Sequence, residues 1–350
     1  MRILVTGSTG FIGASIVAEL QNRGHAVVAC VHHADNSRLP AGTRVIEVDY
    51  MRDLTADAWL PRLAGIDVVI NAVGILRESA QATFAELHHL APRALFQACE
   101  QSAVRRVIQI SALGADKDAT SRYHRTKRAA DNYLRGSNLD WTILQPSVVF
   151  GPRGASTLLF LGLASQPLIP LVGRGEQRMQ PLHIDDLVSM VLRLIEHRLG
   201  LKQTIVAVGY EDVSMRTMLA VYRKSLGLGK AFMLPVPLAL IRLAARLGDI
   251  VKSGALSSET LRMLLRGNTG PVAATQRILG HSPRALKDFI QPDEMASLRL
   301  RALWSWRRPL LLLSIALVWL VAGVVSWMFA RDPGTALLEA LLFGLMAAPS

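Results

Sequence analysis

The first part of the chain alternates short apolar runs with segments of helical periodicity. Six apolar runs have the length and composition of buried parallel strands. They are Arg2–Thr6, Ala26–Val31, residues 44–48, residues 68–72, Arg106–Ile110 and residues 141–144. Between them, residues 13–23, 82–102 and 124–135 repeat apolar positions at helical spacing. This alternation predicts an α/β fold in which helices cover both faces of a parallel sheet.

The pattern changes near residue 150, where glycine and proline become frequent. We therefore expect a doubly wound, Rossmann-type domain over residues 1–150, with segments of 151–210 returning to its sheet. Residues 151–295 predict a smaller, mostly helical domain on the substrate side. Its helices are expected over residues 185–198, 214–226 and 236–247.

A long uncharged run lies near the end of the chain. Residues 309–330 are 22 residues without a charge, roughly 33 Å as a helix, which is enough to cross a bilayer core. This length disfavours the alternative of a buried core helix. The basic segment 296–308 before the run predicts, by the positive-inside rule, that the preceding domains face the cytoplasm at the cell (inner) membrane. Residues 335–348 form a partial second apolar segment.

Composition removes several classes of protein. Hydrophobic residues make up 51% and charged residues 19% of the chain, a balance that excludes disorder. Cys30 and Cys99 lie in apolar segments, so a disulfide framework is not expected. No metal site is expected either, because no spacing of cysteines or histidines resembles a zinc site. A net charge of +12 raises the possibility of nucleic-acid binding. The arginines are scattered, however, and four directly precede the apolar run, so membrane lipid is the expected partner and nucleic acid ranks last.

The turn between the first strand and the first helix has the pattern GxxGxxG. Its residues are Gly7, Ser8, Thr9, Gly10, Phe11, Ile12 and Gly13. Glycines at these places permit a tight turn, a close approach of backbone N–H groups to a pyrophosphate, and close packing of helix on strand. Because an apolar strand precedes this turn and an amphipathic helix follows it, we interpret it as a dinucleotide site.

The end of the second strand selects between the two nicotinamide cofactors. His32 stands there in place of an acidic residue that would hold the ribose of NAD, and Arg38 follows. NADP(H) is therefore favoured over NAD(H), although Arg38 is equally well explained as an exposed loop residue. Asp49 and Tyr50 after the third strand are expected to flank the adenine, or to form a simple strand-end turn. Four residues after the fourth strand are expected to support the cofactor: Asn71, Ala72, Val73 and Gly74.

Tyr123 and Lys127 are the candidates for acid and base chemistry. They lie four residues apart on a predicted helix and so share a face. The ammonium group is expected to lower the phenol pKa and to make Tyr123 a proton donor or acceptor near neutrality. Ser111, at the end of the fifth strand, is expected to polarise a substrate carbonyl.

Taken together, these motifs resemble the extended or atypical short-chain dehydrogenase/reductases, also described as NAD-dependent epimerase/dehydratase-like proteins. The resemblance covers residues 1–290 and also rests on residues 111–114, 145–152 and 180–186. It is nearest the branch that includes the nucleotide-binding accessory subunit of respiratory complex I, and the tail is similar to a DoxX-like membrane region. It implies that Tyr123 is the acid/base, that Lys127 binds the nicotinamide ribose, that Ser111 orients the carbonyl and that Pro146 contacts the cofactor.

Two positions depart from the family pattern. Residues 87–89 contain His88 and His89 where the family often has asparagine, and Gln145 replaces the usual arginine before Pro146. Both departures leave the substrate and the reaction type open. His183 is a candidate substrate contact, and Asp185 and Asp186 are expected to cap the helix that follows.

Two functions from different classes follow. The first is a membrane-anchored NAD(P)-dependent oxidoreductase acting on a carbonyl, alcohol or sugar-like substrate, with a lipophilic substrate suggested by the membrane anchor. The second is a non-catalytic NADPH-binding subunit or redox sensor. Retention of Ser111, Tyr123 and Lys127 favours the enzyme.

Overall fold

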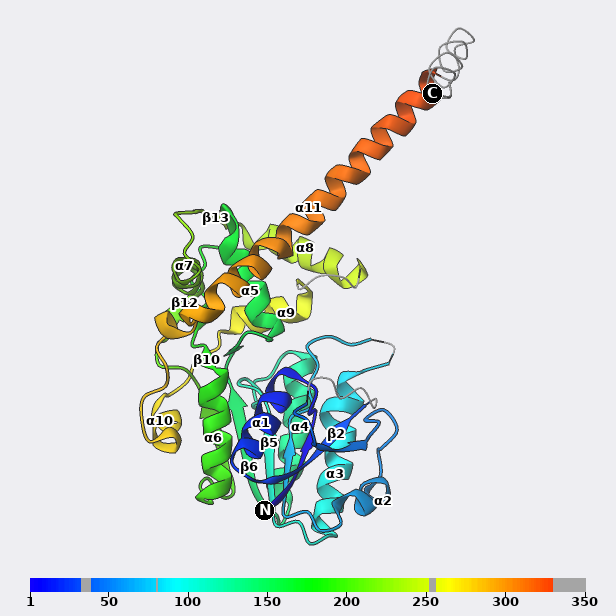
Figure 1. The fold of residues 1–350 in the computed structure, drawn as a ribbon, viewed down its shortest axis with the longest axis vertical. Coiled ribbons are helices and arrows are strands. Elements are labelled where there is room, and N and C mark those ends of the chain that lie inside the picture. Colours follow the sequence, from blue (N-terminus) through cyan, green and yellow to red (C-terminus); the bar gives the residue numbers. More distant parts are fainter. Residues whose placement is uncertain (33–38, 80, 252–255, 330–350) are drawn as a thin grey trace, which may run out of the picture.

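A seven-stranded parallel sheet forms the centre of the nucleotide-side domain (Figure 1). The computed structural model describes residues 1–32, 39–79, 81–251 and 256–329. The strands stand in the order β11-β6-β5-β4-β1-β2-β3. They are β1 (Arg2–Thr6), β2 (Ala26–Val31), β3 (Arg44–Glu47), β4 (Val68–Asn71), β5 (Arg106–Ile110), β6 (Asp140–Pro146) and β11 (Gln203–Ala207). The six predicted strands are therefore confirmed, and the order reverses at β1, where a doubly wound sheet opens a crevice between the carboxyl ends of β1 and β4.

Helices cover both faces of the sheet, as expected from the alternating pattern. One face packs on α1 (Phe11–Asn22), α6 (Ile184–Glu196) and α10 (Ala273–Leu279). The opposite face packs on α2 (Ala56–Trp59), the 3-10 turn η1 (Leu60–Leu63), α3 (Ala91–Glu100) and α4 (Arg122–Gly136). Because β11 and α6 come from beyond residue 150, the chain leaves the sheet after β6 and then returns to its edge.

The helix expected over residues 82–102 is interrupted. It begins with a π-helical turn, η2 (Glu86–Leu90), and continues as α3. Pro92 lies in the first turn of α3 and has no backbone N–H to donate to the residue four places earlier. This missing donor accounts for the wider turn, which places His88 on the side of the helix that faces α4.

The substrate-side domain combines helices with three two-stranded ladders. The ladders are β7 (Val149–Phe150) with β10 (Leu182–His183), β9 (Arg178–Met179) with β12 (Val213–Ser214), and β8 (Leu168–Val172) with β13 (Phe232–Val236). The helices are α5 (Ala155–Ser165), α7 (Met215–Ser225), α8 (Leu238–Val251), α9 (Ser258–Arg266) and the 3-10 turn η3 (Leu286–Asp288). Their own core includes Phe150, Tyr222 and Phe289.

The chain then forms one long helix, α11 (Pro292–Phe329), which projects from the body (Figure 1). The basic segment 296–308 belongs to this helix and packs on α5, with Leu298 and Ala302 buried. Trp306 donates from Nε1 to Ser165 Oγ (3.0 Å). Small side chains explain the close fit, since a Cβ on Gly162 would lie 2.5 Å from Ser305 Oγ.

Beyond this contact α11 is apolar and exposed. Within the described residues it is the one helix long and apolar enough to cross a membrane, by length and composition. Trp304 and Trp327 remain exposed on it. The second apolar segment, 335–348, lies outside the described residues.

Candidate active site

The glycine turn joins β1 to α1 through contacts that only glycine allows. Gly7 has φ +67°, and a Cβ there would lie 2.7 Å from the carbonyl oxygen of Ala72. A Cβ on Gly13 would lie 2.1 Å from the oxygen of Gly7, which already accepts a hydrogen bond from Gly10 N (2.9 Å). Strand, turn and helix are therefore packed backbone to backbone, as the sequence predicts.

The amino end of α1 offers the donors that a pyrophosphate needs. Gly10 is its N-cap and supplies no side-chain hydrogen bond, and the first turn contains no acidic residue. The unpaired N–H groups and the positive end of the helix dipole therefore fit a dinucleotide phosphate. Ser8 supports the turn from inside, because its hydroxyl donates to the oxygen of Val5 (2.6 Å).

Asn71 at the end of β4 is the centre of a buried polar network. Its Oδ1 accepts from Thr6 Oγ1 (2.6 Å) and Tyr50 Oη (3.0 Å), and its Nδ2 donates to Gln109 Oε1 (2.7 Å). The network ties the ends of β1, β4 and β5 together beneath the cofactor crevice. These hydrogen bonds hold the three strand ends in place, although Gln109 Nε2 has no hydrogen-bond partner among the described residues.

Asp49 and Tyr50 follow β3, and their expected role beside an adenine stays a prediction. The ring of Tyr50 is buried and packs edge-on against Trp59, with centroids 5.4 Å apart. An aromatic ring is stabilised by such a core contact, and the Tyr50 hydroxyl donates to Asn71 Oδ1. The carboxylate of Asp49 accepts from Met51 N (2.9 Å) and pairs with Arg52 (3.5 Å), contacts that are also typical of a strand-end turn.

Lys127 reaches the cofactor crevice from α4. Its Nζ donates to the carbonyl oxygens of Val73 (2.8 Å) and Ile110 (3.1 Å), and a Cβ on Gly74 would lie 3.3 Å from it. An ammonium group has three donors, so one remains for a ribose hydroxyl. Burial lowers the pKa of Lys127 to about 8, although the carboxylate of Asp131 acts in the opposite direction.

Tyr123 lies one turn before Lys127 and is enclosed by aromatic rings. The rings of Phe84, His88 and His124 each meet it nearly edge-on, at 5.9, 5.1 and 5.3 Å. The expectation that Lys127 lowers the phenol pKa is wrong for this arrangement. Burial, and then the charge of Asp131, raise the pKa of Tyr123 to about 12.

His88 occupies the place where the family often has asparagine. It is fully buried, its Nε2 accepts from Ile75 N (3.0 Å), and its Nδ1 faces Thr126 Oγ1 (3.3 Å). Burial and the nearby charge of Lys127 lower its pKa to about 2, so the ring stays neutral. His88 therefore joins the loop after β4 to the catalytic helix as a fixed hydrogen-bonding spacer.

Ser111 makes a contact that the sequence did not indicate. Its hydroxyl donates to Asp131 Oδ2 (2.6 Å), a fully buried carboxylate four residues beyond Lys127. Gln145 Nε2 also faces this oxygen (3.5 Å), while Asp131 Oδ1 has no hydrogen-bond partner among the described residues. Burial raises the pKa of Asp131 to about 6. The expected role of Ser111 in polarising a substrate carbonyl stays a prediction. It requires the Ser111 hydroxyl to give up its hydrogen bond to Asp131 and donate to the carbonyl instead.

The remaining predicted residues are spread around this centre. Pro146 is buried at the end of β6, and its oxygen accepts from Leu113 N (2.9 Å). His32 is exposed after β2, whereas Arg38 lies outside the described residues. Phe11 and Ile12 pack on the sheet core. The Phe11 ring is so close to Gly151 that a Cβ there would lie 2.7 Å from the ring.

The helix after β10 is capped differently from the prediction. His183, not an aspartate, is the N-cap of α6, and its Nδ1 accepts from Asp185 N (3.2 Å). Both aspartates hold Arg284: Asp185 Oδ2 accepts from Arg284 Nη2 (2.9 Å), and Asp186 Oδ2 accepts from its backbone N (2.8 Å). His183 is buried against Phe150 and Phe289, so it is a structural contact in this arrangement.

Helix α9 covers the site from the substrate-side domain. Glu259 Oε1 accepts from the backbone N of Tyr123 (2.9 Å). At the other end of α9, Arg266 donates to the oxygen of Gly114 (2.7 Å) and to both carboxylate oxygens of Asp116 (2.6 Å each). No local pattern could have linked residues so far apart in the chain.

Several known proteins are similar to this chain. The match to the Arabidopsis thaliana mitochondrial NADH dehydrogenase [ubiquinone] 1 alpha subcomplex subunit 9 is 25% identical over 55% of this chain. The match to a Caulobacter vibrioides ceramide reductase is 28% identical over 54%. The two matches span 49% and 59% of those relatives. A UDP-glucuronic acid 4-epimerase structure from Bacillus cereus, in complex with UDP-glucuronic acid and NAD, shares the fold over 86% of this chain and 99% of its own, at 20% identity and a TM-score of 0.62.

A family model also matches residues 3–209, described as the NAD dependent epimerase/dehydratase family. This match covers more than half of the chain and contains the glycine turn, Tyr123 and Lys127. The chain belongs to the NAD dependent epimerase/dehydratase family.

Proposed function

We propose that the chain is a membrane-anchored reductase that uses NADP(H), with NAD(H) as the weaker alternative, and reduces a carbonyl group of a lipophilic substrate. The observation that carries this proposal is the position of Tyr123 and Lys127 on one face of α4. Lys127 Nζ reaches the ends of β4 and β5, beside the crevice that the glycine turn opens. The name of the ceramide reductase relative supports a lipid-like substrate.

The residues suggest a division of roles. A bound nicotinamide supplies the hydride. Tyr123, with a pKa of about 12, keeps its proton at neutral pH and is therefore a donor to the carbonyl oxygen. Lys127 holds its place through two backbone carbonyls and directs its third N–H at the ribose. The rings of Phe84 and His88 pack edge-on against the half-buried Tyr123 and hold its ring in place.

A second function, a non-catalytic cofactor-binding subunit, is favoured by one observation. The Ser111 hydroxyl is committed to Asp131, which leaves the carbonyl without its expected side-chain donor. The NADH dehydrogenase subunit among the relatives supports this alternative.

Replacing Tyr123 by phenylalanine separates the two functions. For a reductase we expect turnover of long-chain ketones to fall at least about 100-fold, while NADPH affinity, measured by fluorescence titration, stays the same. Tyr133→Phe is the matched control, because Tyr133 lies on the same helix but donates to Glu100 at the surface. Unchanged turnover in Tyr123→Phe would contradict the proposed role, and retention of neither NADPH nor NADH would overturn both functions.

We further propose that α11 holds the protein in the cell membrane with both domains on the cytoplasmic side. The support is the length and exposure of the apolar part of α11 and the arginines before it. Resistance of the full chain to extraction by alkaline carbonate is the expected result, and release into the supernatant would contradict a span.

A further inference from the structure

Helix α8 has an apolar stripe on the side that does not pack on the protein. Ala245 is buried, with Leu238 and Ile241 beside it, against the small core of α8 and α9. Leu240, Leu243 and Leu247 are exposed by 57%, 56% and 55%. Their spacing of three and four residues puts them on one face, roughly opposite the packed one. A leucine stripe facing outward marks a surface that something else covers.

The ladder of β8 and β13 adds further exposed apolar side chains. Leu168 and Phe232 are register partners and are exposed by 49% and 66%, and Leu234 by 39%. Figure 1 shows α8 and β13 at the end of the body from which α11 projects. The leucine stripe of α8 and the outer face of this ladder, together the apolar end face, therefore lie beside the candidate membrane span.

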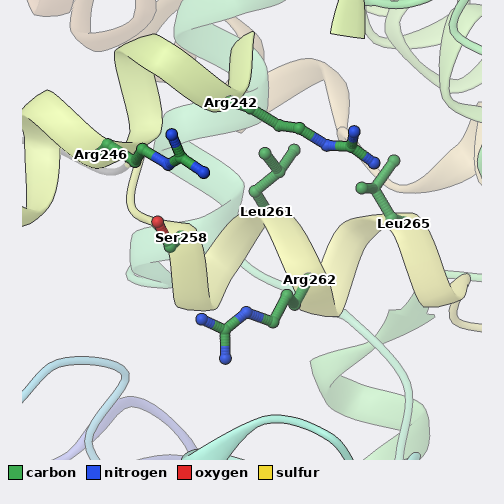
Figure 2. Close-up of a pocket in the computed structure, with 6 residues that line it drawn as sticks. All are labelled: Arg242, Arg246, Ser258, Leu261, Arg262 and Leu265. Carbon is green, nitrogen blue, oxygen red and sulfur yellow. The ribbon is translucent and has the colours of Figure 1, made fainter. Parts of the chain in front are cut away.

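Two arginines border the stripe. Arg242 and Arg246 lie one turn apart on α8 and line an open cavity of about 250 Å³ between α8 and α9. Figure 2 shows their guanidinium groups on either side of Leu261. Arg262 of α9 pairs with Glu259, whereas Arg242 and Arg246 form no ion pair within the described part of the chain. Their positive charge is therefore available to a phosphate.

We propose that the apolar end face docks on an anionic phospholipid bilayer next to α11. In this arrangement α8 lies in the headgroup layer with its leucines among the acyl chains, and Arg242 and Arg246 bind lipid phosphates. This inference rests on the proposed membrane span of α11 in one respect, because the span sets where the bilayer lies. Because α8 packs on α9, and Glu259 of α9 binds the backbone of Tyr123, the docked surface continues directly to the catalytic helix.

The test uses the full chain in vesicles. A Leu243→Cys variant, labelled with an environment-sensitive fluorophore, is mixed into phosphatidylglycerol-containing or phosphatidylcholine vesicles that carry doxyl-labelled acyl chains. Leu201→Cys is the matched control: Leu201 is also exposed, but it precedes β11 at the amino ends of the strands, away from the catalytic crevice. We expect quenching at position 243 and none at 201. Replacing both arginines by glutamine is expected to lower the equilibrium constant for docking on anionic vesicles about 30-fold, from about fivefold for each charge.

Three results would overturn the proposal. They are no quenching at position 243, equal quenching at positions 243 and 201, and a loss of quenching in the arginine variant that is the same on phosphatidylglycerol-containing and phosphatidylcholine vesicles. Disulfide-linked dimers of the unlabelled Leu243→Cys variant, together with no lipid quenching of the labelled one, would show that a second copy covers the stripe and would also overturn the proposal. Carbonate extraction is measured on the same vesicles. A carbonate-resistant chain with an unquenched position 243 would reject docking and leave the span, whereas a released chain with quenching would reject the span and leave docking.

Discussion

Replacing Asp131 by asparagine tests whether this buried carboxylate sets the charge of Lys127. Asparagine has the same shape, so it still accepts the Ser111 hydroxyl, but it removes the negative charge that raises the pKa of Lys127. In the native chain the pKa of Lys127 is about 8, so its ammonium is present below that pH and is lost above it. Without Asp131 the same loss is expected at lower pH.

The size of the shift can be worked from these contacts. A neighbouring opposite charge moves a pKa by about 1 to 3 units, so the midpoint for Lys127 falls from about 8 to about 7 or below. A hydrogen bond from a charged donor contributes about 1.5 to 3 kcal/mol, which is at least about tenfold in affinity. At pH 7.5 the asparagine variant is therefore expected to bind NADPH about 2- to 6-fold more weakly than the native chain.

The assay is the dissociation constant of NADPH between about pH 6.5 and 9.5, read from its fluorescence, which needs no substrate. The native chain should show weaker binding as pH rises through about 8, and Asp131→Asn should show the same change about one pH unit lower or more. Lys127→Gln should give a profile without this step. Asp118→Asn is the control, because Asp118 is exposed in the loop before α4. Identical midpoints in the native and Asp131→Asn chains would refute the coupling.

Two further substitutions test the glycine turn and the hydrogen-bonding role of His88. Gly13→Ala should abolish NADPH binding and lower the unfolding temperature, because its Cβ would lie 2.1 Å from a backbone oxygen. The control Gly136→Ala should be neutral or slightly stabilising, because a Cβ there meets nothing within 4 Å. Equal behaviour of the two variants would contradict the packing argument. His88→Ala should cost about 2 to 4 kcal/mol, since it leaves the N–H of Ile75 without a partner and opens a cavity. His89→Ala should lower the free energy of unfolding much less than His88→Ala. A pH step in NADPH binding that is present in the native chain and absent in His88→Ala would contradict a neutral His88 ring.

The sheet could be predicted because each strand is a local apolar run. Six strands and the glycine turn follow from residues that are neighbours in sequence, whereas the order of the strands is known only from the structure. The seventh strand, β11, has no clear apolar pattern in the sequence, because three of its residues are exposed or half-buried at the sheet edge. The π-helical turn was missed because helical periodicity does not distinguish it from an α-helix, although Pro92 was the available signal.

The site could be predicted only as far as spacing reaches. Tyr123 and Lys127 share a face because they lie four residues apart, and Asp131, four residues further, could have been added by the same rule. The direction of the Tyr123 pKa shift could not be predicted, because it depends on burial and on the charge of Asp131. The burial of the Tyr50 ring has a similar explanation: a residue after a strand can face either the crevice or the core, and only packing decides.

The question of catalysis now centres on Ser111 rather than on the cofactor cradle. The glycine turn, Asn71 and Lys127 would serve a bound nucleotide equally well in an enzyme and in a scaffold. A scaffold, however, has no use for a protonated phenol enclosed by three rings beside that nucleotide. Asp131 has a pKa of about 6, so near that pH it can take a proton and release the Ser111 hydroxyl toward a carbonyl. An enzyme built this way should therefore lose the contribution of Ser111 as pH rises above about 6, and a Ser111→Ala variant should differ from the native chain most on the acidic side of neutrality.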